Sequence, residues 1–197
     1  MKKLSRIAVM LAALAMICVS VMPLIFSDTA AASGSSDPFA GMRTYPAGQY
    51  RVGWDFVEGE YVLLSTSDYA GYFAITTDSN GNDIIANDNF ETNSIVTVRS
   101  GEYLKLNRCV AVYAPDFYSQ YTIRTDNDGT MLRVGVGYDI MPGEYKLIST
   151  SEYQGYWCIY NDSRHTDIVD NDLFSNSAWV TVKSGQYIVL SRCHIQN

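Results

Sequence analysis

An internal repeat constrains the fold of this chain more than any other feature of its sequence. Residues 55–109 align with residues 139–193 without a gap, at an offset of 84 positions, and about half of the aligned residues are identical. Upstream, the tripeptide RVG at Arg51 returns at Arg133, at an offset that is two residues shorter. Residues 114–130, between the two copies, are dissimilar to both. A tandem duplication of one small module accounts for this pattern.

Each copy has the sequence pattern of short β-strands. Runs rich in Val, Ile, Thr, Tyr and Leu alternate with clusters of Gly, Asn, Asp and Ser, and no long segment follows a helical period. We therefore expect an all-β chain. In the first copy the predicted strands are residues 50–52, 61–65, 72–76, 83–86, 95–98 and 103–112, and all but the first recur 84 positions later.

This organisation predicts two tandem, small β-sandwich or barrel-like modules. Module 1 comprises residues 44–113 and module 2 residues 131–197, with residues 114–130 as the joint. Modules of this size bury only a thin hydrophobic core, because the ratio of surface to volume is unfavourable in small domains. We therefore expect the two modules to pack on each other.

The tripeptide Gly-(Glu or Gln)-Tyr occurs five times, and we interpret it as turn chemistry rather than as a ligand-binding motif. In SGEYLKL, a loop at residues 99–101 would join two strands of a hairpin and require a positive φ at glycine. That register collects four apolar side chains on one face, Val96, Val98, Leu104 and Leu106. The five turn glycines are Gly48, Gly59, Gly101, Gly143 and Gly185.

The same hairpin register predicts a candidate ligand surface on the opposite face. In module 2 it places Trp179, Thr181 and Tyr187 together, and in module 1 it places Tyr103 at the position of Tyr187. Exposed aromatic rings stack on the apolar faces of sugars, and nearby polar groups bind the hydroxyls. The alternative is that a second sheet or the other module covers this face, so that the aromatic residues serve in packing.

The first 32 residues have the features of a secretory signal peptide, followed by a linker at residues 33–43. Positive charges at Lys2, Lys3 and Arg6 precede an apolar run of about 20 residues and a small-residue cleavage site at Ala30 and Ala32. Retention as an uncleaved membrane anchor is the alternative. The sequence thus predicts a secreted or extracytoplasmic protein.

The net charge argues against nucleic acid as a partner. The whole chain carries a formal charge of −7, and loss of residues 1–32 makes it more negative, because that segment holds three basic residues and one acidic one. A polyanion is repelled by such a surface.

Two segments carry a resemblance to a known type of module, IIANDNF at residues 84–90 and VTVRSGEYLKL at residues 96–106. Together with RVG, GEY and GYF they resemble an uncharacterised tandem repeat module of secreted or surface-attached proteins of Gram-positive bacteria. The resemblance covers nearly the whole chain after the signal peptide. It implies an extracytoplasmic all-β module and brings no assigned activity, cofactor or site residue.

An acidic stretch in module 1 resembles the start of a calcium loop. Asp78, Asp83 and Asp88 lie among asparagines, which is typical of oxygen-rich calcium sites. The sixth position of such a loop is Asp83 where glycine is required, and the twelfth is Asn89 where a bidentate glutamate is required. We favour turn-capping side chains here, with a weak Ca²⁺ site as the alternative, and expect no other cofactor.

The sequence contains no duplicated catalytic apparatus. The two histidines, His165 and His194, occur only in module 2, where module 1 has Gly81 and Val110. No nucleophile motif or zinc motif is present, so we expect a protein that is not an enzyme.

Beyond the signal peptide the chain has an odd number of cysteines, Cys109, Cys158 and Cys193. Buried free thiols are the first interpretation. The alternatives are a bridge between Cys109 and Cys193 or one between Cys158 and Cys193.

Together these features predict an exported, non-enzymatic module that binds extracellular carbohydrate, envelope material or protein at the cell surface. The alternative is a structural spacer or assembly subunit that binds no small ligand. A hydrolase is the least favoured function.

Overall fold

The computed structural model describes residues 37–196, and the predicted signal peptide lies outside this part. Residues 43–196 belong to one compact unit, and residues 37–42 belong to a second. Within residues 37–42 the chain forms a short turn, in which the Asp37 carboxylate accepts a hydrogen bond from the Phe39 amide. In the part of the chain that is described, no helix is both long and apolar enough to cross a membrane.

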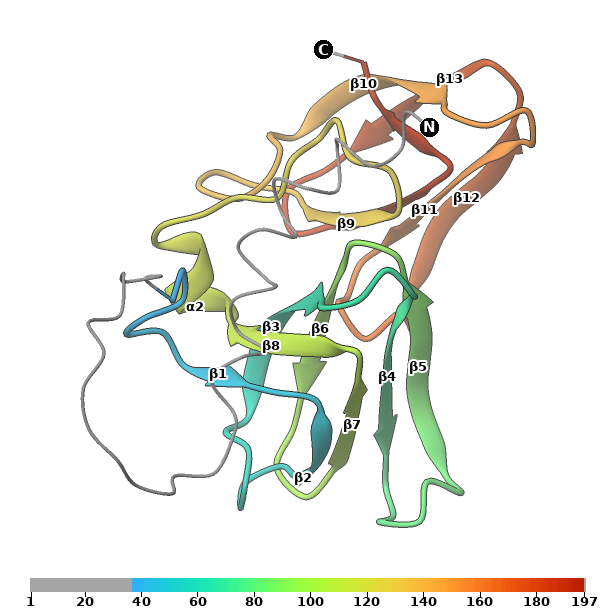
Figure 1. The fold of residues 1–197 in the computed structure, drawn as a ribbon. Coiled ribbons are helices and arrows are strands. Elements are labelled where there is room, and N and C mark those ends of the chain that lie inside the picture. Colours follow the sequence, from blue (N-terminus) through green and yellow to red (C-terminus); the bar gives the residue numbers. More distant parts are fainter. Residues whose placement is uncertain (1–36, 197) are drawn as a thin grey trace. The chain divides into compact units, whose positions relative to one another are not determined.

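Module 1 consists of two antiparallel sheets of four strands each (Figure 1), which confirms the all-β prediction. The first sheet has the order β1-β8-β3-β6, and the second has the order β2-β7-β4-β5. The strands are β1 (Thr44–Tyr45), β2 (Gly48–Arg51), β3 (Gly59–Ser65), β4 (Gly71–Thr76), β5 (Ile84–Phe90), β6 (Asn93–Val98), β7 (Tyr103–Asn107) and β8 (Cys109–Tyr113).

Module 2 has the same order of equivalent strands, β13-β10-β15 in one sheet and β12-β11-β14-β9 in the other. Registers also agree, since Gly59 pairs with Val98 and Gly143 pairs with Val182, each 84 positions later. Among the described residues, no strand of module 2 corresponds to β1. The strands are β9 (Thr130–Arg133), β10 (Gly143–Ser149), β11 (Gly155–Tyr160), β12 (Ile168–Phe174), β13 (Ser177–Val182), β14 (Tyr187–Ser191) and β15 (Cys193–Ile195).

The hydrophobic core of module 1 lies between its two sheets. Aromatic rings fill its centre, with ring centroids 4.0 Å apart for Tyr45 and Phe56 and 4.5 Å apart for Phe56 and Tyr61. Each fully buried large apolar side chain contributes about 1.5–3 kcal/mol to stability. The four apolar side chains predicted to share a face, from β6 and β7, all belong to this core.

The predicted hairpin of residues 95–98 and 103–112 is wrong, however. Strand β6 pairs with β3, whereas β7 pairs with β2 and β4, so the turn between them carries the chain from one sheet to the other. Gly101 in this turn has φ +91° and Gly185 has φ +86°, as the turn chemistry requires. The apolar side chains share a core because the two sheets face each other.

The predicted strand over residues 103–112 is also two strands rather than one. Arg108 lies between β7 and β8 with φ +52°, and Arg192 lies between β14 and β15 with φ +55°. A residue in the left-handed region interrupts a pleated strand, so the chain turns from the second sheet into the first at this point.

The joint contains a short helix, α2 (Ala114–Tyr118), which the sequence pattern did not reveal. Asp139 of module 2 anchors this region, because its carboxylate accepts hydrogen bonds from the Tyr118 hydroxyl at 2.9 Å and from the Ile123 amide at 2.6 Å. The same carboxylate accepts a bond from the Arg133 amide at 2.7 Å. These hydrogen bonds link the joint to the start of module 2.

Candidate functional site

The most elaborate arrangement of side chains is the interface between the two modules. Ile95 on β6 is fully buried against Met131 on β9 and Tyr187 on β14. Tyr160 and Val189 pack around this cluster. One residue of module 1 therefore inserts among four residues of module 2.

Polar contacts surround this apolar centre. Glu60, on β3, accepts a hydrogen bond from the Tyr187 hydroxyl and forms a salt bridge with Arg133. The Arg133 guanidinium lies over the ring of Tyr138, 3.8 Å from its centroid. Burial raises the pKa of Tyr187, and the carboxylate of Glu60 raises it further, so the hydroxyl stays protonated and donates. We call Glu60, Ile95 and Thr97 the knob face of module 1, and Met131, Arg133, Tyr187 and Val189 the cradle face of module 2.

The loop between β11 and β12 closes one side of the interface. The Ser163 hydroxyl lies 2.7 Å from the Thr97 hydroxyl, and Arg164 forms a salt bridge of 2.8 Å with Glu102. Arg164 also donates to the Thr97 carbonyl at 3.1 Å. The side chains of Arg164 and Glu102 are only 10% and 13% exposed, so this ion pair is partly desolvated.

His165 of the same loop reaches into module 1. Its imidazole ring packs edge-on against Phe73, with centroids 5.4 Å apart, and is stacked with Tyr160 at 5.0 Å. The imidazole Nε2 lies 3.4 Å from the Ser94 hydroxyl, and Nδ1 lies 3.5 Å from the Asp88 carboxylate. The side chain thus fills the space between the modules.

The side chain of Asn93, on β6, links module 1 to β9 at the edge of the interface. Its side-chain amide donates to the Met131 carbonyl at 2.7 Å, and its side-chain oxygen accepts from the Met131 amide at 3.3 Å and from the Thr130 hydroxyl at 2.5 Å. Hydrogen bonds of this reciprocal kind fix the position of β9 along β6.

The structure gives the Gly-(Glu or Gln)-Tyr motif two distinct roles. At Gly101 and Gly185 the middle residue closes the turn, because Glu102 accepts from the Arg99 amide and Gln186 from the Lys183 amide. A side-chain oxygen suffices for this contact, so glutamate and glutamine are interchangeable.

At the other three sites, Gly48, Gly59 and Gly143, the glycine is the first residue of a strand, β2, β3 or β10, rather than part of the predicted turn. Here the tyrosine hydroxyl donates to the carbonyl four residues before it. The bonds join Tyr50 to Pro46, Tyr61 to Val57 and Tyr145 to Met141. Gly59 has φ +141°, whereas Gly48 and Gly143 do not have positive φ.

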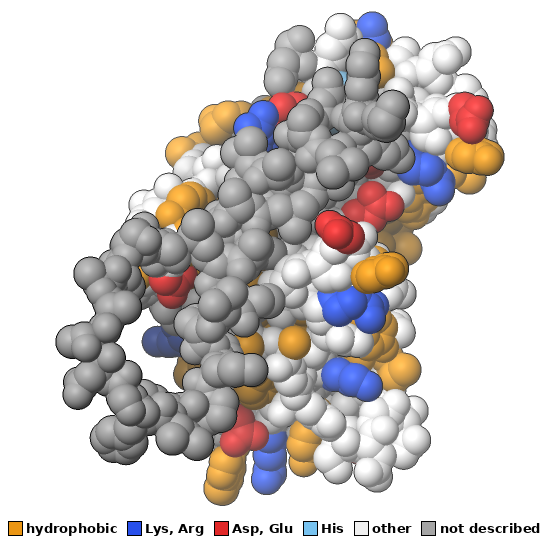
Figure 2. Space-filling model, in the orientation of Figure 1, with side chains coloured by type: hydrophobic (Ala, Val, Ile, Leu, Met, Phe, Trp, Pro, Cys, Tyr) orange, Lys and Arg blue, Asp and Glu red, His pale blue; other side chains and the backbone are white. Residues whose placement is uncertain are grey.

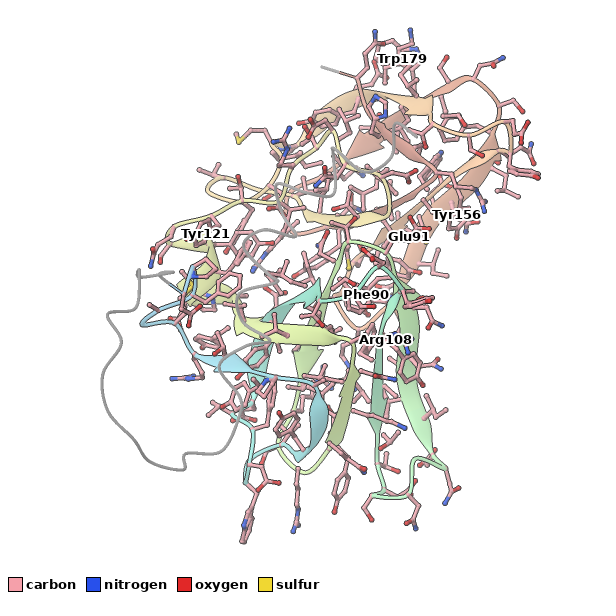
Figure 3. The ribbon with its side chains drawn as sticks, in the orientation of Figure 1. Phe90, Glu91, Arg108, Tyr121, Tyr156 and Trp179 are labelled. Atoms are coloured by element: carbon pink, nitrogen blue, oxygen red, sulfur yellow. The ribbon has the colours of Figure 1, made fainter. Side chains whose placement is uncertain are left out.

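The predicted ligand residues do not form one platform. Trp179, labelled in Figure 3, and Thr181 lie on the exposed side of β13. The side chain of Trp179 is 64% exposed, whereas Tyr187 is buried on β14 in the other sheet. Their predicted common face is therefore wrong, and the reason is the missing hairpin pairing between β13 and β14. Tyr103 is half-buried on β7 of module 1.

Module 1 has a hollow of about 140 Å³ at the position that corresponds to the cradle face of module 2. Its lining includes Gln49 on β2, Thr76 on β4, and Tyr103 and Lys105 on β7. These are the equivalents of Met131, Tyr160, Tyr187 and Val189. On the side drawn in Figure 2, acidic, basic and hydrophobic side chains of the described residues are interspersed.

The three aspartates of the calcium hypothesis do not meet. Asp78 caps its own loop and accepts hydrogen bonds from the amides of Asp83, Asn80 and Asn82, which lower the pKa of its carboxyl. Asp83 accepts from the Thr77 hydroxyl, and Asp88 lies near His165. Over residues 37–196 no three side chains of His, Cys, Asp or Glu gather into a group that would hold a metal ion.

All three cysteines of the described part are free and buried. The Sγ atoms of Cys109 and Cys193 lie 3.6 Å and 3.3 Å from the carbonyls of Tyr72 and Tyr156. Burial raises the pKa of Cys109 to about 11 and that of Cys193 to about 12, so both thiols are protonated at neutral pH.

No protein-family model and no curated protein sequence matches this chain. The residues that join the modules, above all Glu60, Arg133 and Arg164, were not identified from the sequence. One signal was available at Arg164 and His165, because these are charged or aromatic residues at positions where module 1 has Asn80 and Gly81.

Proposed function

We propose that this protein is a structural spacer or assembly subunit, which acts outside the cytoplasm and performs no catalysis. The observation that carries this proposal is the burial of Tyr187 between the modules. Tyr187, one of the aromatic residues that were expected to bind ligand, instead packs between the modules. The extracytoplasmic location is supported by the signal-like sequence of residues 1–32.

The chemistry of the interface supports a fixed arrangement of the modules. An apolar insertion, a carboxylate with two partners and a second partly desolvated ion pair are combined in one surface. Breaking such a surface exposes apolar area and leaves charges unpaired, which opposes independent motion of the modules.

The proposal is tested by calorimetric unfolding of the purified protein and of the variant Glu60→Lys. We expect a single cooperative transition for the unchanged protein, because the modules stabilise each other, and two transitions for the variant. Two separate transitions in the unchanged protein would contradict the proposal. Glu144→Lys, at the equivalent position of module 2, is the matched control.

A second candidate function rests on the exposure of Trp179. A single exposed tryptophan beside polar Thr181 supports binding of extracellular carbohydrate, the class first predicted for this surface. A glycan array with the protein and with Trp179→Ala separates the two functions. Sugar binding that is lost in the variant would replace the spacer proposal, whereas no binding leaves the spacer as the function.

A further inference from the structure

The two modules dock through different surfaces, and this leaves one surface of each kind unused. The knob face of module 1 contacts the cradle face of module 2. The knob face of module 2, with Glu144, Trp179 and Thr181, and the cradle face of module 1, with Gln49, Arg51, Tyr103 and Lys105, have no such partner within residues 37–196.

We propose that the partner of each unused face is a second copy of this chain, bound head to tail. Module 2 of one copy would place its knob face on the cradle face of module 1 of the next copy. A contact between two different surfaces does not close on itself after two subunits, so the assembly grows by addition of further copies. This inference rests on the proposed function and names the partner of the assembly subunit.

The central polar contacts of the internal interface all have equivalents at the unused faces. Glu60 corresponds to Glu144, Arg133 to Arg51, and Tyr187 to Tyr103, so the carboxylate, the guanidinium and the phenol are all retained. The hydroxyl pair of Thr97 and Ser163 corresponds to Thr181 and Ser79. For these central contacts, the unused faces therefore offer the same donors and acceptors.

Arg51 lies near an aromatic ring, as its counterpart in module 2 does. The guanidinium of Arg51 lies 5.1 Å from the ring centroid of Trp54, as Arg133 lies over Tyr138, and Arg51 stands opposite Tyr103 in the strand register. Across residues 37–196, Arg133 has an acidic partner and Arg51 forms no ion pair. Glu144 is exposed and likewise forms none within those residues. The two groups are complementary charges on separate faces.

In two of the contacts where the repeats differ, both partners have changed together. The ion pair of Glu102 and Arg164 becomes Gln186 and Asn80, two neutral amides. The contact of Ser94 and His165 becomes Ala178 and Gly81, so neither side keeps an unmatched polar group. Asp88, which lies near His165, is unchanged in the repeat: its equivalent is Asp172, which would face Gly81 instead of a histidine.

The size of the side chains changes in the same compensating manner. The inserted residue of module 1 is Ile95, and its equivalent in module 2 is the larger Trp179. On the receiving side, module 1 has the smaller Thr76 and Gly81 where module 2 has Tyr160 and His165. These smaller residues line the hollow of about 140 Å³ on module 1. In the proposed contact the exposed indole of Trp179 would face the hollow, where Lys105 would bring a cation to the aromatic ring.

A further observation is an unsatisfied polar group at Trp157, on β11 of module 2. Trp157 corresponds to Phe73, whose ring is contacted by His165 of the neighbouring module. The indole Nε1 of Trp157 is buried and has no hydrogen-bond partner among the described residues. Buried donors in folded proteins almost always have a partner. The loop at Ser79, Asn80 and Gly81 of a second copy would bring polar groups to the corresponding place.

The first test is sedimentation velocity of the purified protein over a series of concentrations up to about 1 mM, the range in which even weak contacts are populated. We expect the average sedimentation coefficient to rise continuously with concentration, as copies add without limit. A monomer at every concentration overturns the inference, and so does a dimer that binds no further copy.

The second test exchanges the charges on the two faces. Glu144→Arg and Arg51→Glu should each weaken self-association at least about tenfold. An equimolar mixture of the two variants should restore it, because one contact then joins the two native faces and the other joins the two substituted faces, whose charges are again opposite. Glu152→Arg, an exposed acidic residue outside the knob face, is the control and should change nothing. Association that persists in both variants overturns the proposed pairing.

The third test removes the inserted side chain. Trp179→Ser should abolish association, whereas Tyr153→Ser, which removes another exposed aromatic ring of module 2, should leave it intact. Equal effects of the two variants overturn the inference. None of these changes touches the internal interface, so a single unfolding transition in these variants shows that a failure of self-association leaves the spacer function standing.

Discussion

Equivalent residues of the two modules stand in opposite environments. Ile95 is fully buried by the next module, whereas Trp179, at the same place in the repeat, is 64% exposed. Conversely, Tyr187 is buried at the interface and its equivalent Tyr103 borders an open hollow. The role of a residue in a repeat protein therefore depends on whether another module packs against it, as well as on its position in its own module.

The largest expected effect comes from the carboxylate that joins the modules. Glu60→Lys should destabilise the protein by about 3–5 kcal/mol, because Arg133 then faces a like charge and Tyr187 loses its acceptor. Glu144→Lys should change stability by less than about 0.5 kcal/mol, since Glu144 is exposed. Urea unfolding measures both, and similar losses would contradict the comparison.

The apolar residue at the centre of the interface is the next test. Ile95→Ala should cost about 2–4 kcal/mol, because it leaves a cavity beside Met131 and Tyr187. Trp179→Ala in module 2 should be close to neutral at concentrations where the protein is a monomer. Thermal unfolding of the two variants side by side would refute this comparison if the tryptophan variant were the less stable one.

The turns between the sheets should be sensitive in both modules. Gly101→Val and Gly185→Val should each cost about 1–3 kcal/mol, because valine is strained at φ +91° and +86°. No atom lies within 4 Å of the place where a Cβ would stand at either position, so backbone strain is the only cause. Circular dichroism during heating gives the measurement, and an unchanged midpoint in either variant would show that the turn tolerates a side chain.

The smallest effect concerns the equivalent thiols in alkaline solution. The folded-state pKa values of Cys109 and Cys193 are raised to about 11 and about 12, from 9.0. The unfolded chain therefore loses these protons first, and stability falls as the pH rises above about 9, by at most about 1.4 kcal/mol per pH unit and thiol. Cys109→Ala and Cys193→Ala should each make this decline shallower in urea unfolding at pH 8–10. A decline of the same slope in both variants would assign it to other groups.

Sequence periodicity was sufficient for some features of the fold and insufficient for others. Alternation along a strand correctly grouped Val96 and Val98 with Leu104 and Leu106, because all four face one core. It did not reveal that β6 and β7 lie in different sheets, since alternation says which side chains share a face and not which strand lies beside another. The positive φ of Gly101 was predictable because the turn chemistry is local.

The interface was harder to predict for a related reason. Glu60 and Arg133 are 73 positions apart, and nothing in the local sequence of either indicates the other. Trp179 and Tyr187 were expected to act together because they are close in sequence, yet the fold separates them into an exposed and a buried site. Contacts between modules depend on the relative placement of two folded units, which short-range patterns do not contain.

The small residues of the module 1 hollow have a consequence for the choice of partner. The cradle face of module 2 is occupied by Ile95, and the stacked rings of Tyr160 and His165 lie beside this isoleucine. On module 1 the smaller Thr76 and Gly81 stand at the positions of these two rings. Under the proposed head-to-tail contact, the larger indole of Trp179 would be favoured by the smaller residues of module 1 over the larger ones of module 2. Side-chain volume alone would tell the two ends of the chain apart and keep successive copies in a single register.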